Sequence, residues 1–312
     1  MSLGAPTATG LITAWSLQPV AIVTAVAATG WYVWARHRLL ASGGQWPGVR
    51  TAAYLAGVAL FVWSTCGYLQ VYAQSLYWAW TTQVLVLLLA VPVLILVGRP
   101  AELARRAARP TSGGFGGFFS NPLVGPALVP FICVLLLFGP VPGWAAEFDA
   151  VDWLLPLIVV ALGAAVAAPL LSIGQVGTSL AVGVASAVLL VELLVDAVPG
   201  IVLRLRTTAA STFFAHRHLH LWSPLPLHDQ QIGGSILWCV AESADLPLLV
   251  AIFVAWVHVD AREAREVDAV LTAERAMRGP APDAVTDESG EPTADPVWWL
   301  ADPSMRDRFR QG

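Results

Sequence analysis

Four of the chain's six histidines lie in the segment STFFAHRHLHLWSPLPLHDQQ, residues 211–231. His216, His218 and His220 alternate along it, and His228 follows eight residues later. In an extended backbone, alternate side chains point to the same face, so these imidazoles can together bind Cu(II), Cu(I) or Zn(II). The same spacing also fits a solvated basic loop. The segment is therefore a candidate metal site with a plain structural alternative.

Four acidic side chains fall inside two long apolar runs of the C-terminal half. An ionisable side chain is costly inside a bilayer, so these residues are functional candidates. Within each run the two carboxylates are three or four residues apart and share a helix face. They can line a proton or cation site, or serve as structural partners of Arg204 and Arg206. The four residues are Glu192, Asp196, Glu242 and Asp245.

The three cysteines, Cys66, Cys133 and Cys239, all lie in apolar runs and form no CxxC pair. Neither a disulfide framework nor a zinc ribbon is predicted. Because thiolates prefer Cu(I) to harder cations, Cys239 is a further candidate copper ligand beside the histidine segment. No Gly-rich phosphate loop, GxSxG elbow, HExxH or CxxCH motif occurs in the sequence. We predict no catalytic residues and no enzymatic activity.

These side chains must be positioned by membrane helices. Of the 312 residues, 57% are apolar and 12% are charged, and apolar runs of about 20 residues recur, each long enough to cross a bilayer as a helix. Transmembrane strands would be shorter and would alternate. The predicted fold is all-α, a polytopic bundle of about seven transmembrane helices in the lipid bilayer. The predicted spans are residues 17–35, 52–71, 78–98, 122–141, 152–172, 178–202 and 235–258.

The distribution of arginine orients this bundle, because positively charged loops face the cytoplasm. The loops after the first and third spans are basic, whereas those after the second and fourth contain no Lys or Arg. The prediction is a multi-pass protein of the cell membrane with an extracytoplasmic N-terminus and a cytoplasmic C-terminus. The loop 203–233 departs from this pattern. The basic residues are Arg36, Arg38, Arg50, Arg99, Arg105, Arg106 and Arg109 in the two basic loops, and Arg204, Arg206 and Arg217 in the exception.

Two regions follow from these patterns. Residues 1–262 are predicted to form the transmembrane domain, and residues 263–312 a cytoplasmic tail that begins as a helical extension and is then largely disordered. The formal net charge is only −4, and acidic residues gather in the tail. No nucleic-acid partner is predicted.

Two stretches resemble the CtaG family of cytochrome c oxidase assembly factors. In the first, Trp46, Pro47 and Arg50 precede a span, and the following aromatic and apolar segment ends in a turn formed by Gly98 and Pro100. In the second, HDQQIGGSILW is similar to the family's Asp, Gly pair and Trp at the start of the last helix. The matching residues there are Asp229, Gly233, Gly234 and Trp238.

The resemblance implies a seven-helix membrane protein that supplies copper to the oxidase and has oxidase subunits as partners. The family's third-helix histidines correspond to Trp80 and Val84 here, and the fifth-helix region reads VDWLLPL without an imidazole. The resemblance therefore carries over the architecture, and the histidine segment is the candidate replacement for the metal site. The main hypothesis is an oxidase assembly factor that assists copper delivery or oxidase maturation at the extracytoplasmic face. The alternatives are a proton- or cation-coupled transporter and a structural membrane subunit that binds no metal.

Overall fold

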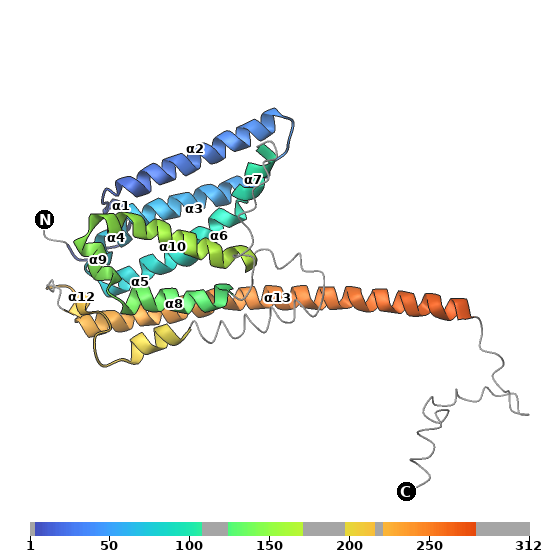
Figure 1. Cartoon of the computed structure of the whole chain (residues 1–312). Coiled ribbons are helices and arrows are strands. Elements are labelled where there is room, and N and C mark those ends of the chain that lie inside the picture. Colours follow the sequence, from blue (N-terminus) through green and yellow to red (C-terminus); the bar gives the residue numbers. More distant parts are fainter. Residues whose placement is uncertain (1–3, 108–123, 171–196, 216–220, 279–312) are drawn as a thin grey trace, which may run out of the picture. The chain divides into compact units, whose positions relative to one another are not determined.

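The computed structural model describes residues 4–107, 124–170, 197–215 and 221–278. Every regular element within these ranges is a helix, which confirms the all-α prediction for the described part of the chain. The chain divides into two units, Met1–Trp256 and Val257–Gly312. The first unit contains the packed helices that position the candidate site (Figure 1).

A proline begins the second of the N-terminal helices, and a glycine separates the third from the fourth. Pro19 occupies the first position of α2, where its missing N–H is not needed for a helical hydrogen bond. The helix continues past the predicted end at residue 35, so Arg36 and Arg38 lie in its last turns. Gly67, with extended backbone angles, separates α3 from α4. The elements are α1 Gly10–Thr13, α2 Pro19–Ala41, α3 Gly48–Cys66 and α4 Tyr68–Ala73.

The third predicted span is one helical path with a π-helical turn in it. Pro92 has no N–H to bond the carbonyl of Leu88, and the π segment η1 lies directly before it. Gly163 of a later helix packs at this point, where a Cβ would lie 2.0 Å from the Leu88 oxygen. Glycine is thus the residue that allows this approach. The elements are α5 Tyr77–Leu85, η1 Val86–Ala90, α6 Val91–Val97 and α7 Pro100–Ala107.

The remaining helices complete the bundle. Residues 197–205 are also helical. The fourth predicted span is broken at Gly139–Pro140, between α8 and α9. The last helix, α13, begins nine residues before the predicted seventh span and extends beyond it into the second unit. The elements are α8 Val124–Phe138, α9 Val141–Glu147, α10 Asp149–Leu170, α12 Thr212–Ala215 and α13 Pro226–Arg278.

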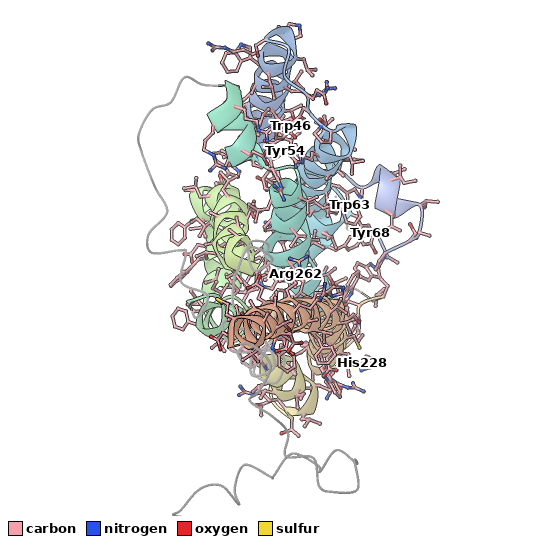
Figure 2. All side chains as sticks on the ribbon, turned by 90° about the vertical axis from the view of Figure 1, so that its right-hand side faces the viewer. Trp46, Tyr54, Trp63, Tyr68, His228 and Arg262 are labelled. Atoms are coloured by element: carbon pink, nitrogen blue, oxygen red, sulfur yellow. The ribbon has the colours of Figure 1, made fainter. Side chains whose placement is uncertain are left out.

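The core lies around α6, which packs on both α3 and α10. Helix α3 packs on α2 and α6, and α10 packs on α6, η1, α8 and α9. Tyr32 and Tyr54 stack with ring centroids 3.9 Å apart, and Val91 and Val159 are almost completely buried. Figure 2 marks Tyr54 and Trp46 near this contact. Many side chains that point outward are also apolar, as a lipid-facing surface requires; they include Val23, Val26, Phe131 and Ile158.

Three described helices are long and apolar enough to cross a membrane: Gly48–Ala73, Tyr77–Ala107 and Asp149–Ala168. They contain the predicted second span, the predicted third span and most of the predicted fifth. The first, fourth and seventh predicted spans fall in α2, α8 and α13, while most of the sixth lies outside the described residues. The total of seven crossings, like the orientation of the termini and the tail boundary at residue 262, stays a prediction.

Candidate functional site

Asp229, in the first turn of α13, caps the start of α5. The first N–H groups of a helix have no partner within the helix, and Leu76 at the N-cap offers no side-chain acceptor. The Tyr77 N–H donates to Asp229 Oδ2 at 2.7 Å and the Trp78 N–H to Oδ1 at 3.2 Å. Asp229 is only 4% exposed. A carboxylate that is distant in sequence thus closes this helix end.

Burial raises the pKa of the Asp229 carboxyl above its ordinary value. The backbone N–H groups of Tyr77 and Trp78 and the nearby His228 act in the opposite direction. The cost of removing the carboxylate from water therefore exceeds the effect of the two hydrogen bonds.

The neighbouring side chain, Gln230, fixes the segment that leads toward the histidines. Its Oε1 accepts a hydrogen bond from the Ala210 N–H at 2.6 Å. Its Nε2 donates to the carbonyl oxygens of Leu203 at 3.3 Å and Thr208 at 3.5 Å. Gln230 is 2% exposed, and its bond to Leu203 is buried while those to Ala210 and Thr208 are partly buried. Asp229 and Gln230 together join α13, α5 and the 203–210 segment.

The glycine pair lets α13 approach its neighbours. A Cβ at Gly233 would lie 2.8 Å from the Tyr77 ring, and one at Gly234 would lie 2.8 Å from the backbone nitrogen of Arg204. Of the motif residues identified from the sequence, the two glycines therefore allow close packing of helix backbones, and Asp229 caps a helix. Trp238 differs, because its indole is exposed and donates to Glu242 Oε1 at 2.8 Å.

Two aromatic residues of α5 hold the last turn of α8. The final carbonyl groups of a helix lack intrahelical donors. The Tyr77 hydroxyl donates to the Leu137 oxygen at 2.9 Å, and the Trp80 indole N–H donates to the Leu136 oxygen at 3.0 Å. Both side chains are buried. The start of α5 thus bonds to both α13 and α8.

A chain of three glutamines and one aspartate runs through the same part of the bundle. The Nε2 groups of Gln18 and Gln70 donate to the two oxygens of Asp152 at 2.5 and 2.9 Å. Gln83 Nε2 donates to Gln70 Oε1 at 2.5 Å and to the Ser64 carbonyl at 2.9 Å. We call Gln18, Gln70, Gln83 and Asp152 the Asp152 network. It links α2, α4, α5 and α10 and keeps this carboxylate hydrogen-bonded.

A cavity of about 20 Å³ lies beside the Asp152 network, with room for about one water molecule. Trp80 and Val84, where the resembling family has histidines, line it together with Asp152 from VDWLLPL. The resemblance thus identified positions that do converge. The lining offers a single carboxylate and two amides, with neither imidazole nor thiol, and such donors do not suit Cu(I). No copper step is assigned to this cavity. The remaining lining residues are Gln70, Gln83, Leu87, Leu155, Pro156 and Val159.

The proposed metal ligands are only partly within the described structure. His216, His218 and His220 lie outside it, whereas His228, labelled in Figure 2, is exposed at the start of α13. Cys239 is also exposed, eleven residues further along the same helix. A rise of 1.5 Å per residue separates the two by about 16 Å, so they cannot bind one ion. Among the described residues, no three His, Cys, Asp or Glu side chains gather as a metal site.

The four carboxylates of the transport hypothesis are not seen together. Glu192 and Asp196 lie outside the described residues. Glu242 is exposed and bonded to Trp238 of its own helix, and for Asp245 the structure describes the α13 backbone but not the side chain. The prediction of a shared carboxylate site stays untested.

The remaining family-matching residues, Gly98 and Pro100, lie at the other end of α6. The Tyr32 hydroxyl donates to the Gly98 oxygen at 2.9 Å and accepts from the Trp46 indole N–H at 3.0 Å. Arg99 has a φ of +48°, which ends the helix, and Pro100 starts α7. A side chain from another part of the chain thus hydrogen-bonds the Gly98 carbonyl at this end, as Asp229 hydrogen-bonds the N–H groups at the Tyr77 end.

Sequence reasoning missed the Asp152 network and Gln230. The search was directed at ionisable and metal-binding residues inside apolar runs; uncharged amides did not qualify, and Asp152 is at the edge of the predicted fifth span. Gln18, Gln70 and Gln83 are each less than 10% exposed. A glutamine in an otherwise apolar span carries the same physical signal as a charge, because its amide must find a partner.

Comparison with known proteins follows these observations. Residues 30–258 match the family model described as cytochrome c oxidase caa3 assembly factor, Caa3_CtaG. Two similar but uncharacterised proteins come from Mycobacterium leprae and Mycobacterium bovis, with 24% identity over 286 and 289 residues, respectively. Each alignment covers 84% of this chain and 42% of the relative, so the chain spans less than half the length of these curated relatives. No solved structure matches the chain.

Proposed function

The chain belongs to the Caa3_CtaG family of cytochrome c oxidase caa3 assembly factors, and on that premise we propose that it assists copper delivery to the oxidase as a non-catalytic membrane protein. The exchange takes place at the extracytoplasmic face, where the histidine segment is predicted to lie. The partners are oxidase subunits that accept the ion. The protein supplies ligands and orientation and makes no covalent change to its cargo.

One observation carries this proposal: the histidine segment is held at both ends. Gln230 fixes the chain before it through Ala210, Leu203 and Thr208. Asp229 fixes the chain after it by capping α5 at Tyr77 and Trp78. The histidines therefore belong to a segment whose entry and exit are fixed. Such fixation lowers the entropy that a metal site must lose when its ligands are ordered.

The donor chemistry favours this segment over the bundle interior. Imidazoles bind both copper oxidation states, and several neutral imidazoles on one segment allow an ion to be passed on by stepwise replacement of ligands. The Asp152 cavity has no such donors. Cys239 is too far from His228 to complete the same coordination shell, so the proposal places the ion on the histidines.

The test is a Cu(I) titration of the full-length protein in detergent. The variant replaces His216, His218, His220 and His228 by Ala, and the matched control replaces the two remaining histidines, His37 and His258. We expect the wild type and the control to bind near-stoichiometric copper and the fourfold variant to lose it. Equal binding by all three proteins would place the site elsewhere. An absence of binding in all three would refute direct copper handling and leave a scaffold role in oxidase maturation.

A cellular measurement links binding to assembly. Cells that express the fourfold variant should contain oxidase with less copper than cells that express the His37 and His258 control, at equal amounts of either protein in the membrane. Equal copper occupancy of the oxidase in the two strains would show that these histidines do not take part in copper delivery.

A further inference from the structure

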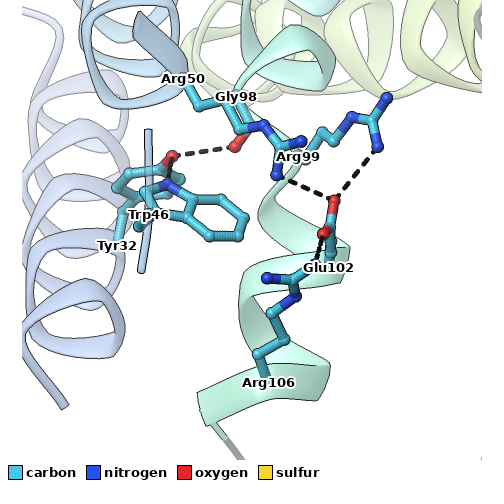
Figure 3. A network of polar contacts seen from close by, with 7 residues as sticks. All are labelled: Tyr32, Trp46, Arg50, Gly98, Arg99, Glu102 and Arg106. Carbon is cyan, nitrogen blue, oxygen red and sulfur yellow. Dashed lines mark hydrogen bonds and ion pairs between the residues drawn. The ribbon is translucent and has the colours of Figure 1, made fainter. Parts of the chain in front are cut away.

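Three guanidinium groups converge on one carboxylate at the end of α6 (Figure 3). Arg50 Nη1 lies 3.1 Å and Arg99 Nη1 lies 3.3 Å from Glu102 Oε2, and Arg106 Nη2 lies 2.5 Å from Oε1. We call Arg50, Arg99, Glu102 and Arg106 the arginine cluster. Its net charge is +2, since three positive charges meet a single negative one.

The cluster faces outward while its centre is shielded. The side chains of Arg99 and Arg106 are 54% and 52% exposed, whereas that of Glu102 is 17% exposed. A guanidinium has five N–H donors, and the contact with Glu102 engages one terminal nitrogen of each arginine. Further N–H donors of the exposed arginines thus remain for a second anion.

An aromatic ring helps to fix the arginines. The Cζ atoms of Arg50 and Arg106 lie 5.0 and 5.9 Å from the centre of the Trp46 ring, within the range of cation–π attraction. Trp46 is itself fixed, because its indole N–H donates to the buried Tyr32 hydroxyl. Two of the three guanidiniums are therefore held in place before any ligand arrives.

The cluster follows a helix that is long and apolar enough to cross a membrane. Residues 77–97 form a helical path of about 32 Å, which suffices to cross a hydrocarbon core of about 30 Å. Arg99 follows it after Gly98, and α7 is anchored by the fully buried Leu103. Helix α2, which packs on α7, contains Arg36, whose Nε is buried with no hydrogen-bond partner among the described residues.

We propose that the arginine cluster binds the phosphate of an anionic phospholipid headgroup, with Glu102 as the residue that positions the three guanidiniums. Planar guanidiniums match phosphate oxygens in geometry and charge. Without Glu102 the three cations repel one another and separate. The carboxylate therefore gathers the ligand groups, although its own charge is the same as that of the lipid.

This arrangement differs measurably from a diffuse attraction between basic residues and an anionic membrane. The substitution Glu102→Gln raises the net charge of the cluster by one. A diffuse attraction would then strengthen roughly fivefold for the added charge near an anionic surface. A built site would weaken, because its guanidiniums are no longer held together.

The experiment measures lipid binding to the full-length protein in detergent, with phosphatidylglycerol compared with phosphatidylcholine. We expect the wild type to prefer phosphatidylglycerol roughly tenfold and E102Q to lose most of that preference. Arg105→Gln is the matched control, because Arg105 is exposed on the same helix but is not among the three arginines that pair with Glu102 in the described structure. R105Q should stay within about twofold of the wild type.

Three results would overturn the proposal. The wild type could fail to distinguish the two lipids, or E102Q could bind phosphatidylglycerol as tightly as the wild type or tighter. Inorganic phosphate could also displace the lipid where chloride at equal ionic strength does not, which would identify a soluble anion as the ligand. If E102Q does not fold, the double variant R99Q/R106Q decides, with loss of the preference expected and its retention contradicting the site.

Discussion

The helical path from Tyr77 to Val97 is closed by polar groups at both ends, but the two closures differ in kind. At the Tyr77 end a single carboxylate, Asp229, is 4% exposed and accepts two backbone N–H groups. At the Val97 end the Tyr32 hydroxyl caps Gly98, and beyond it the arginine cluster lies half exposed. The first end is closed by one buried carboxylate. The second end is closed by a buried hydroxyl, and charged side chains that are accessible to solvent lie beyond it.

This difference separates structural from binding roles. A buried acceptor that is lost leaves donors without water or protein partners, and the full cost of their desolvation falls on the fold. Exposed ion pairs are screened and contribute little to stability, so their arrangement is free to serve a ligand. The Tyr77 end should therefore respond to substitution in stability and the Val97 end mainly in binding.

The largest effect is expected for Asp229→Ala. The substitution leaves the N–H groups of Tyr77 and Trp78 without acceptors in a buried place, which should lower the free energy of unfolding by about 3 kcal/mol. Denaturant unfolding in detergent measures it. Glu242→Ala removes an exposed carboxylate from the same helix and should change stability by less than about 0.5 kcal/mol. Equal losses for both variants would contradict a special role for the cap.

The pH dependence of the free energy of unfolding tests the role of Asp229 in a second way. Because the pKa of Asp229 is raised in the folded protein, the folded state keeps its proton over a pH range in which the unfolded state has released it. Stability should therefore fall as the pH rises from the ordinary aspartate value of about 3.9 through the folded pKa. Asp229→Asn should remove this contribution. A wild-type profile that coincides with that of D229N would show that this carboxyl does not titrate differently on folding.

At the other end, Tyr32→Phe should have an intermediate effect. Tyr32 is completely buried, and its hydroxyl serves both the Gly98 carbonyl and the Trp46 indole. Its loss leaves two buried groups unpaired, so we expect a destabilisation of about 2 kcal/mol in the same unfolding experiment. Tyr54→Phe removes one partly buried bond to the Ala28 oxygen and should lose about 1 kcal/mol or less. A larger loss for Y54F would exclude Tyr32 as the main cap.

The sequence predicted the elements better than their contacts. Hydropathy identified three helices that the structure also finds, because a run of apolar residues is a local property. The resemblance pointed to Asp229, Gly98 and the glycine pair without indicating what they touch. Asp229 meets Tyr77 about 150 residues away, and such pairs depend on how each helix is rotated and packed. Local periodicity does not encode that rotation.

The contacts of the arginines could not be predicted from the sequence either. Their distribution along the chain predicted an orientation of the bundle, but a count of charges does not indicate which of them meet. Arg50 of α3 and Arg106 of α7 share Glu102 and the face of Trp46, because α2 packs on both α3 and α7. The Asp152 network was missed for a related reason, since hydropathy assigns its glutamines no partner.

Glu102→Gln should have the smallest effect on stability and thereby sharpen the contrast between the two ends. Its three ion pairs involve arginines that are 26% to 54% exposed, so we expect a loss of less than about 1 kcal/mol, measured against D229A in the same denaturant series. The loss should shrink further in 0.5 M salt, because exposed charges are screened. A loss as large as that of D229A would make the cluster a structural closure like Asp229. A small loss together with a weakened preference for anionic lipid would place the role of Glu102 in binding, since the fold would then be intact while the ligand groups are no longer held in place.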